Sequence, residues 1–456
     1  MRLSKGQLRA RIKGSPRITF SEERISAHGG LELLRRYVVG LGLRQRLAQA
    51  VELPSDYGAA SILLALIGMI VVGGVRITHL AFLGVDPVLL RFSGLKQLPT
   101  DRTVVDLLKR FTDATLLALS DLIRDLVYEQ VERSKLRRLT IDLDGTVLRT
   151  GAKVDGAARG FNPHHPKDPS YYPLTAHLAQ TGQILRVWNR PGNVHDSHNA
   201  TGFLRIVLGE LGERFGSRKL LELRMDGAFF SPTVLRFLEG EKAEWAMKVP
   251  LWKWLGIRDA IARRKRWTRV DPRIDGFATT LRVPQWNQIL RVVVYRKRVF
   301  HETRKNFQLD LFSPDDGTYE YSAVATNKDL SVRALWHFIA GRGAHEKTLA
   351  ELKQNYGFAA IPTNDRTANA AWQLISVLTL NLVRSFQIAL GAPRRPRTLK
   401  RTYDCVFASL QTLRFELIHQ PARLVRPGGR AELRFAVAPR AREKIRAAES
   451  HLRSAA

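Results

Sequence analysis

Residues 139–146 read Leu-Thr-Ile-Asp-Leu-Asp-Gly-Thr. Apolar and polar side chains alternate along this stretch as far as Asp144, which is the pattern of a β-strand. The Gly145-Thr146 pair that follows predicts a break in the strand. Because side chains two residues apart on a strand emerge on the same face, Asp142 and Asp144 lie side by side. The stretch therefore predicts a strand that presents two carboxylates on one face.

The sequence that follows this strand alternates between strand and helix patterns. Residues 184–189 and 220–225 are predicted strands, and residues 199–215 between them have helical apolar spacing. Strands that alternate with helices indicate an α/β core. Residues 241–329 are strand-like and rich in turns, and a helical pattern returns at residue 330.

The sequence that precedes the strand reads as helical from residue 1 to about 130. Residues 59–75 carry no charge, but this run is shorter than the ~20 residues that a membrane-spanning helix needs, and it contains three glycines. We interpret it as a helix buried in a helical domain. Residues 394–456 hold 15 Lys and Arg against 5 Asp and Glu, so this segment is strongly basic.

The composition narrows the possible functions. The chain has 456 residues with 73 Lys and Arg against 42 Asp and Glu, a formal net charge of +31. A compact protein with this charge repels itself, and a polyanion is the usual compensation, so nucleic acid is the first candidate partner and an anionic membrane surface the second. The single cysteine, Cys405, excludes an intramolecular disulfide and a cysteine-cluster zinc site.

Further carboxylates stand in settings that suit metal ions. Asp226 ends the predicted strand 220–225 and precedes a glycine, and Glu346 lies on a predicted helix. Carboxylates at strand ends that converge with one from a helix supply the hard oxygen ligands that a pair of Mg²⁺ ions needs. Asp144, Asp226 and Glu346 are therefore candidate metal ligands, with Asp142 as a further candidate beside Asp144.

Two cations share the helix with Glu346. Arg342 lies four residues before it and Lys353 seven residues after it, so the three side chains project from one face. Cations on both sides of a metal-binding carboxylate could hold a DNA phosphate backbone against the metals.

Taken together, these motifs resemble DDE transposases of bacterial insertion sequences, in the group with an Arg-x3-Glu-x6-Lys signature and a β-rich insertion. The resemblance covers residues 136–390 well and the N-terminal region more loosely. It rests on the order and spacing of six motifs: Asp144-Gly-Thr, Gly160–Pro163, Tyr172–Leu174, Pro191–Val194, Asp226-Gly-Ala-Phe and the Arg342/Glu346/Lys353 set.

The resemblance implies an α/β fold with an RNase H-like catalytic core. The expected segments are a helical DNA-binding region (1–130), the first part of the catalytic core (131–240), a β-rich insertion (241–329), the second part of the core with Glu346 (330–392), and a basic C-terminal segment (393–456).

The resemblance also implies the activity. Asp144, Asp226 and Glu346 would hold two Mg²⁺ ions, for which Mn²⁺ substitutes, and Arg342 and Lys353 would bind DNA. The enzyme would cleave the terminal inverted repeats of its own element and join them to target DNA. We expect a homodimer or larger assembly on DNA, a cytoplasmic location at the bacterial nucleoid and no membrane partner.

Related enzymes with such an insertion use an aromatic side chain to hold a flipped base, and the tryptophans of residues 241–329 are candidates.

One position departs from the family pattern, and at another the pattern does not settle which residue is the first acid. The signature usually has a tyrosine three residues before the arginine, where this chain has Ile339, with Phe338 beside it. The pattern Asp-x-Thr selects Asp144 as the first acid, yet Asp142 lies on the same face and could also bind a metal ion.

Two alternatives remain open from the sequence. Residues 141–147, Ile-Asp-Leu-Asp-Gly-Thr-Val, match the first motif of haloacid-dehalogenase-like phosphatases, in which Asp142 would be the nucleophile and Asp144 the general acid. No convincing acidic pair on a strand follows, since Asp315-Asp316-Gly317 lies in a predicted turn. The other alternative is a domesticated relative that keeps the fold and binds DNA without cutting it.

Overall fold

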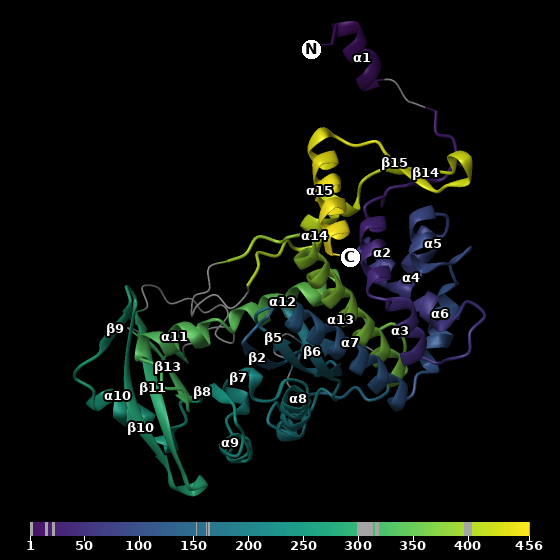
Figure 1. Cartoon of the computed structure of the whole chain (residues 1–456). Helices are drawn as coiled ribbons and strands as arrows, with labels where there is room; N and C mark the ends of the chain where they lie inside the picture. Colours follow the sequence, from purple (N-terminus) through teal and green to yellow (C-terminus); the bar gives the residue numbers. More distant parts are fainter. Residues whose placement is uncertain are drawn as a thin grey trace.

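The computed structural model describes residues 3–455 except 14–16, 21–22, 152, 161, 163–164, 299–312, 315–318 and 396–403. Phe161 and Pro163 of one transposase-like motif, and the turn at residues 315–317, thus lie outside the described residues. The chain builds a mixed sheet flanked by helices and a separate helical body (Figure 1). The predicted α/β class is confirmed.

Five strands form the half of the sheet that carries the candidate site. Their order is β6-β5-β2-β7-β8, in which β5 pairs antiparallel with β2 and β6, while β7 is parallel to β2 and β8. This is the arrangement expected of an RNase H-like core. The strands are β2 (Arg138–Gly145), β5 (Leu174–Leu178), β6 (Gln183–Trp188), β7 (Leu220–Met225) and β8 (Glu244–Val249).

Helices cover this part of the sheet through a shared apolar core. Side chains of α8 (Ala200–Phe215), α9 (Pro232–Glu239) and the C-terminal half of α7 (Asp113–Arg133) are buried together with alternate residues of β2, β7 and β8. The strand β2 is buried almost throughout, because it lies inside the sheet between β5 and β7 and the helices pack on its apolar face.

The β-rich segment extends the same sheet rather than forming a second one. After β8 the order continues β13-β11-β10-β9, and Figure 1 shows the long β10–β11 hairpin projecting from the body. The range predicted as an insertion, 241–329, includes β8, which pairs directly with β7 of the core. The added elements are α10 (Ile257–Arg263), β9 (Thr268–Asp271), β10 (Ile274–Val283), β11 (Gln288–Arg298), β12 (Ser313–Pro314) and β13 (Tyr319–Thr326).

Three helices follow β13, the last strand of this sheet in chain order. The helix α11 (Val332–Ala340) packs on the extended sheet, and α12 (Gly343–Asn355) carries Glu346. The third, α13 (Arg366–Ala389), is buried along most of its length and packs against α4, α6 and α7 of the N-terminal region as well as β6. It thus joins the catalytic sheet to the helical body.

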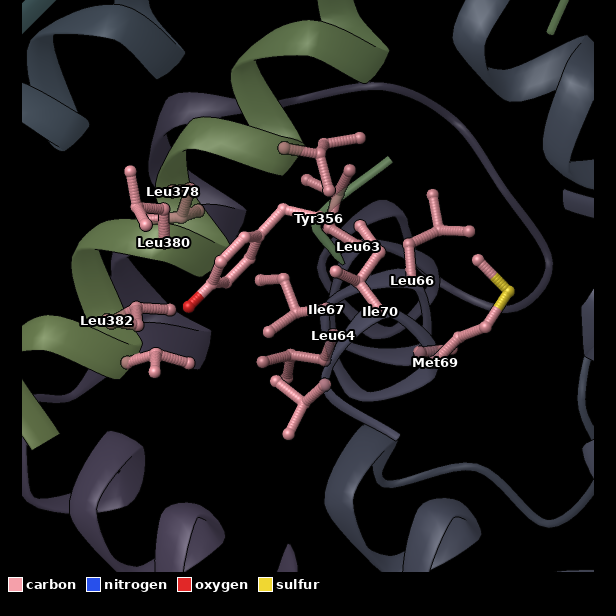
Figure 2. Close-up of a cluster of buried hydrophobic side chains, with 14 of the residues drawn as sticks. Leu63, Leu64, Leu66, Ile67, Met69, Ile70, Tyr356, Leu378, Leu380 and Leu382 are labelled. Atoms are coloured by element: carbon pink, nitrogen blue, oxygen red, sulfur yellow. The ribbon is translucent and has the colours of Figure 1, made fainter. Parts of the chain in front are cut away.

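The helical body is built from both ends of the chain. Its N-terminal helices are α2 (Leu31–Gly40), α3 (Leu43–Ala50), α4 (Ala59–Val71), α5 (Pro87–Ser93) and α6 (Asp101–Lys109). All residues of α4 are buried, and Figure 2 shows their side chains gathered with Tyr356 and leucines of α13. The interpretation of this apolar run as a core helix is confirmed. Among the helices that the structure describes, none combines the length and the apolar character that crossing a bilayer requires.

The C-terminal segment folds back onto the N-terminal region. The strand β14 (Ala422–Val425) pairs with both β1 (Ile25–Ser26) and β15 (Glu432–Phe435). The last helix, α15 (Pro439–Ala455), packs beside α2, and Arg36 of α2 forms an ion pair with Glu449 at 2.7 Å. The remaining described α-helices and β-strands are α1 (Lys5–Lys13), β3 (Leu148–Arg149), β4 (Ser170–Tyr171) and α14 (Leu410–Leu413).

Candidate active site

Two neighbouring parallel strands place the first two acids together. Asp144 lies at the C-terminal end of β2, and Asp226 follows the last residue of β7. Because the two strands are parallel neighbours, their carboxyl ends meet at the same edge of the sheet. The side chain of Asp226 also accepts a hydrogen bond from the backbone N–H of Ala228 at 2.9 Å, which fixes the turn after the strand.

Arg342 joins the three predicted acids into one cluster. Its Nη2 lies 2.9 Å from Oδ2 of Asp144 and 3.8 Å from Oδ2 of Asp226. Its Nη1 lies 3.3 Å from Oε1 of Glu346, one turn further along the chain. A single guanidinium can contact all three carboxylates only when they converge, so the sequence-predicted acids share one place in the fold. Arg342, which we predicted as a DNA contact, occupies the centre of that place.

Two buried histidines fix the start of α12 against the sheet. His345, next to Glu346, stacks on His177 of β5, with ring centroids 4.7 Å apart and planes 3° from parallel. The Nε2 of His345 lies 3.1 Å from Thr175 Oγ1, and the Nε2 of His177 lies 3.3 Å from Thr348 Oγ1. Burial lowers the pKa of both imidazoles, so they are neutral at pH 7. The position of Glu346 is therefore set by its buried neighbour.

Asp142 lies deeper on β2 and has different surroundings. It is fully buried, and its two carboxylate oxygens accept hydrogen bonds from Nε and Nη2 of Arg224 at 2.5 and 2.8 Å. Burial opposes its ionisation, but Arg224 and His177 outweigh burial and hold its pKa well below the usual range. Arg224 thus occupies both oxygens of this predicted metal ligand, so in this structure Asp142 has the surroundings of an ion pair.

Two acids of the cluster, Asp144 and Glu346, hold protons more tightly than free carboxyls do. Burial, together with the nearby carboxylates of Asp226, Asp196 and Glu346, raises the pKa of Asp144 to about 8 against the opposing charge of Arg342. Burial also raises the pKa of Glu346. The carboxylates of Asp144, Asp226 and Glu346 raise the pKa of Arg342 in spite of its burial. Negative charge is thus crowded at this edge of the sheet, which favours binding of a cation.

Lys353 faces the same region from the far end of α12. Its side chain is half-buried, and burial lowers its pKa, against the opposing effect of the Asp144 carboxylate. Within the described part of the chain, no hydrogen bond or ion pair engages its ammonium group. A half-buried ammonium group without a partner is suited to accept a phosphate.

The oxygen donors of Asp144, Asp226 and Glu346 are of the kind that a hard divalent cation prefers, but their present geometry is not that of a metal site. Within the described residues, no group of three or more His, Cys, Asp or Glu side chains is arranged so that it could hold a metal ion as it stands. The three carboxylates nevertheless supply only oxygen donors, and they converge on one positive group. A metal ion would therefore replace the contacts that Arg342 now makes.

The tryptophans of the β-rich segment divide into two groups. Trp245 is buried in the core, and Trp267 packs edge-on against Phe277. Trp252 and Trp254 are exposed and stacked, with centroids 5.5 Å apart. Trp252 and Trp286 pack on Phe230, four residues after Asp226, and Trp254 contacts Trp286. These tryptophans therefore contact the segment that follows the second acid.

Sequence reasoning missed one acid of this region, Asp196. It follows the Pro191–Val194 motif by two residues and is buried, and its charge acts on Asp144. The Pro191–Val194 motif marks this loop in the sequence, but no sequence pattern distinguishes the carboxylate of Asp196 within it.

A family profile described as "Transposase DDE domain group 1" matches residues 11–456. The chain belongs to this family. It is a DNA transposase, an enzyme that cleaves and transfers DNA, and members of the family generally use divalent metal ions. The match supports neither the phosphatase nor the non-catalytic alternative.

Comparison with solved structures finds the piggyBac transposase in a synaptic complex with hairpin DNA. It is 11% identical, with 82% of this chain and 78% of that chain covered and a TM-score of 0.43. No curated protein matches the sequence significantly.

Proposed function

We propose that Asp144, Asp226 and Glu346 are the catalytic acids of this transposase. The observation that carries the proposal is the convergence of all three on Arg342, from two strand ends and one helix. The reaction is cleavage of DNA at the ends of the enzyme's own insertion sequence, followed by joining of those ends to target DNA.

The same three carboxylates would hold the metal ions, for which we propose two Mg²⁺ with Mn²⁺ as a substitute. When bound, such ions stabilise charge on the attacking and leaving oxygens of a phosphodiester, so that no covalent enzyme intermediate is needed. Asp142 takes no direct part in our proposal. Its ion pair with Arg224 keeps β2 in place, and Arg224 also donates to the carbonyl of Phe338, at the end of α11.

Arg342, which directly precedes α12, and Lys353 in its last turn would bind the DNA backbone. Arg342 neutralises the acids in the absence of metal ions, and its guanidinium is then available to a DNA phosphate once these ions replace it. Lys353 supplies a second phosphate contact from the same helix face. Both groups would hold the scissile strand against the carboxylates without carrying out proton transfer.

The rest of the DNA interface is assigned to the helical body and the basic segment after residue 393. The net charge of +31 supports extensive contact with the DNA backbone. Handling two element ends together requires more than one active site, so we propose a homodimer or larger assembly on DNA.

Excision in cells tests this proposal. A marker is placed between the native flanking sequences of the gene, and wild-type protein, Glu346→Gln or Glu213→Gln is supplied. Glu213 is an exposed acid on α8 and matches the charge change away from the site. We expect excision with wild type and Glu213→Gln, and none with Glu346→Gln even though that variant still binds end DNA. Excision by Glu346→Gln would overturn the assignment, and absence of excision by all three would favour a non-catalytic protein.

A further inference from the structure

The loop after β6 buries a carboxylate that the three-acid site does not account for. Asp196 is only 5% exposed although it lies in a loop. Its Oδ2 accepts a hydrogen bond from the hydroxyl of Tyr172 at 2.7 Å, and its Oδ1 lies 3.3 Å from Nη2 of Arg190. Burying a carboxylate costs free energy unless it is paired. The contacts with Tyr172 and Arg190 therefore hold the Asp196 carboxylate in one defined position.

This position is directly beside the end of β2. A Cβ atom on Gly145 would collide with Oδ1 of Asp196 and with the ring of Tyr172. The glycine that follows Asp144 therefore lets the Asp196 carboxylate approach the backbone of the first acid. The Asp196 charge also acts on Asp144, and Asp226 acts on Asp196 in turn.

Asp196 adds a fourth carboxylate to this edge of the sheet. Asp144, Asp226 and Glu346 share Arg342, and Asp196 pairs with Arg190 over a longer distance. The ammonium groups of Lys353 and Lys248 act on Asp144 and Glu346. Carboxylates gathered in this way supply oxygen groups that suit the surroundings of a bound divalent cation.

We propose that Asp196 is a fourth carboxylate of the catalytic centre, one that strengthens the binding of divalent cations without being a direct ligand. It is a positioning residue: its charge faces the end of β2, and its remaining lone pairs can accept hydrogen bonds from water around a bound cation. The inference rests on the proposed function, since it assumes that Asp144, Asp226 and Glu346 hold the cation. Outer carboxylates of this kind typically change metal affinity by about 10- to 100-fold.

The test is direct titration of the full chain with Mn²⁺, followed by electron paramagnetic resonance of the free ion. Asp196→Asn should weaken Mn²⁺ binding by about tenfold or more. Tyr172→Phe removes the hydrogen bond to Asp196 but keeps the charge, and should bind Mn²⁺ within about threefold of wild type. Asp168→Asn removes a carboxylate that pairs with Arg149 away from the site, and should leave binding unchanged.

The outcomes separate a cation role from a structural one. Thermal unfolding is measured on the same variants, and Asp196→Glu tests whether a displaced charge restores part of the affinity. Unchanged Mn²⁺ affinity in Asp196→Asn, or an equal loss in Tyr172→Phe, would show that the loop only supports the fold and would overturn the inference. Glu346→Gln is titrated in parallel. If it too binds Mn²⁺ normally, the three-acid site itself fails. If Glu346→Gln loses affinity while Asp196→Asn does not, the fourth acid alone is refuted.

Discussion

The inner part of β2 and its C-terminal end each hold an aspartate that pairs with an arginine, yet the two regions differ in kind. Asp142 and Arg224 are both fully buried, and the pair is closed by two hydrogen bonds and a neighbouring imidazole. Asp144 shares Arg342 with two further acids, and these side chains keep partial access to solvent. The buried Asp142–Arg224 pair is suited to stabilise the fold. Arg342, for which three acids compete, is suited to be replaced by metal ions.

The largest expected effect separates these two regions by activity. Asp144→Asn should reduce the rate of DNA cleavage by at least about 10⁴-fold, ~5.5 kcal/mol of transition-state stabilisation, because a ligand at the reacting phosphate is lost. The variant should unfold at or above the wild-type temperature, since a crowded carboxylate is removed. Single-turnover cleavage and thermal unfolding measure the two effects. A variant that fails to fold would place Asp144 with the structural residues instead.

The converse change should act on stability. Asp142→Ala leaves the buried Arg224 without a counter-charge and should lower the free energy of unfolding by about 3–5 kcal/mol. Denaturant unfolding measures this, and the double variant Asp142→Ala/Arg224→Met should recover part of the loss. A stable but inactive Asp142→Ala protein would return Asp142 to the metal ligands.

The pH dependence of cation binding should report on Asp144. Its pKa is raised to about 8, so below this pH a metal ion must displace a proton. Affinity for Mn²⁺ should therefore increase by about tenfold per pH unit between pH 6 and 8, and level off above pH 8. Titrations at several pH values in wild type and Asp144→Asn check this. An equally steep increase in Asp144→Asn would assign the proton to another group.

The smallest effect concerns Lys353. Lys353→Ala should weaken binding to end DNA and reduce the slope of log affinity against log salt by about 0.9, as the loss of one phosphate contact does. Lys347→Ala, an exposed lysine on the same helix, serves as the control. Equal slopes in the two variants would mean that Lys353 does not contact the DNA backbone.

The comparison of Asp142 with Asp144 also shows which features of the site can be predicted from the sequence. Strand alternation and the acids at strand ends predicted the sheet and the three converging carboxylates, because parallel strand ends must meet at one edge. Alternation could not separate Asp142 from Asp144, since both lie on one face. The difference depends on Arg224 and His177, which come from other strands, and such pairings are not encoded in local spacing.

Long-range packing accounts for the other differences. Helices of residues 31–109 share a core with α13 and with the C-terminal segment, although the sequence separates them by hundreds of residues. The strand β8 looked like part of the insertion because it stands beside it in sequence, whereas its pairing with β7 places it in the catalytic sheet. Asp196 was missed because a loop has no periodicity to mark a buried acid.

The most direct test of the central claim is metal rescue of cleavage. Asp144→Cys and Asp142→Cys are assayed on end DNA with Mg²⁺ and with Mn²⁺, because a thiolate accepts the softer Mn²⁺ more readily than Mg²⁺. We expect that Asp144→Cys is inactive with Mg²⁺ and regains cleavage with Mn²⁺, while Asp142→Cys shows no metal-specific recovery. Rescue of Asp142→Cys instead would contradict the assignment of the first acid.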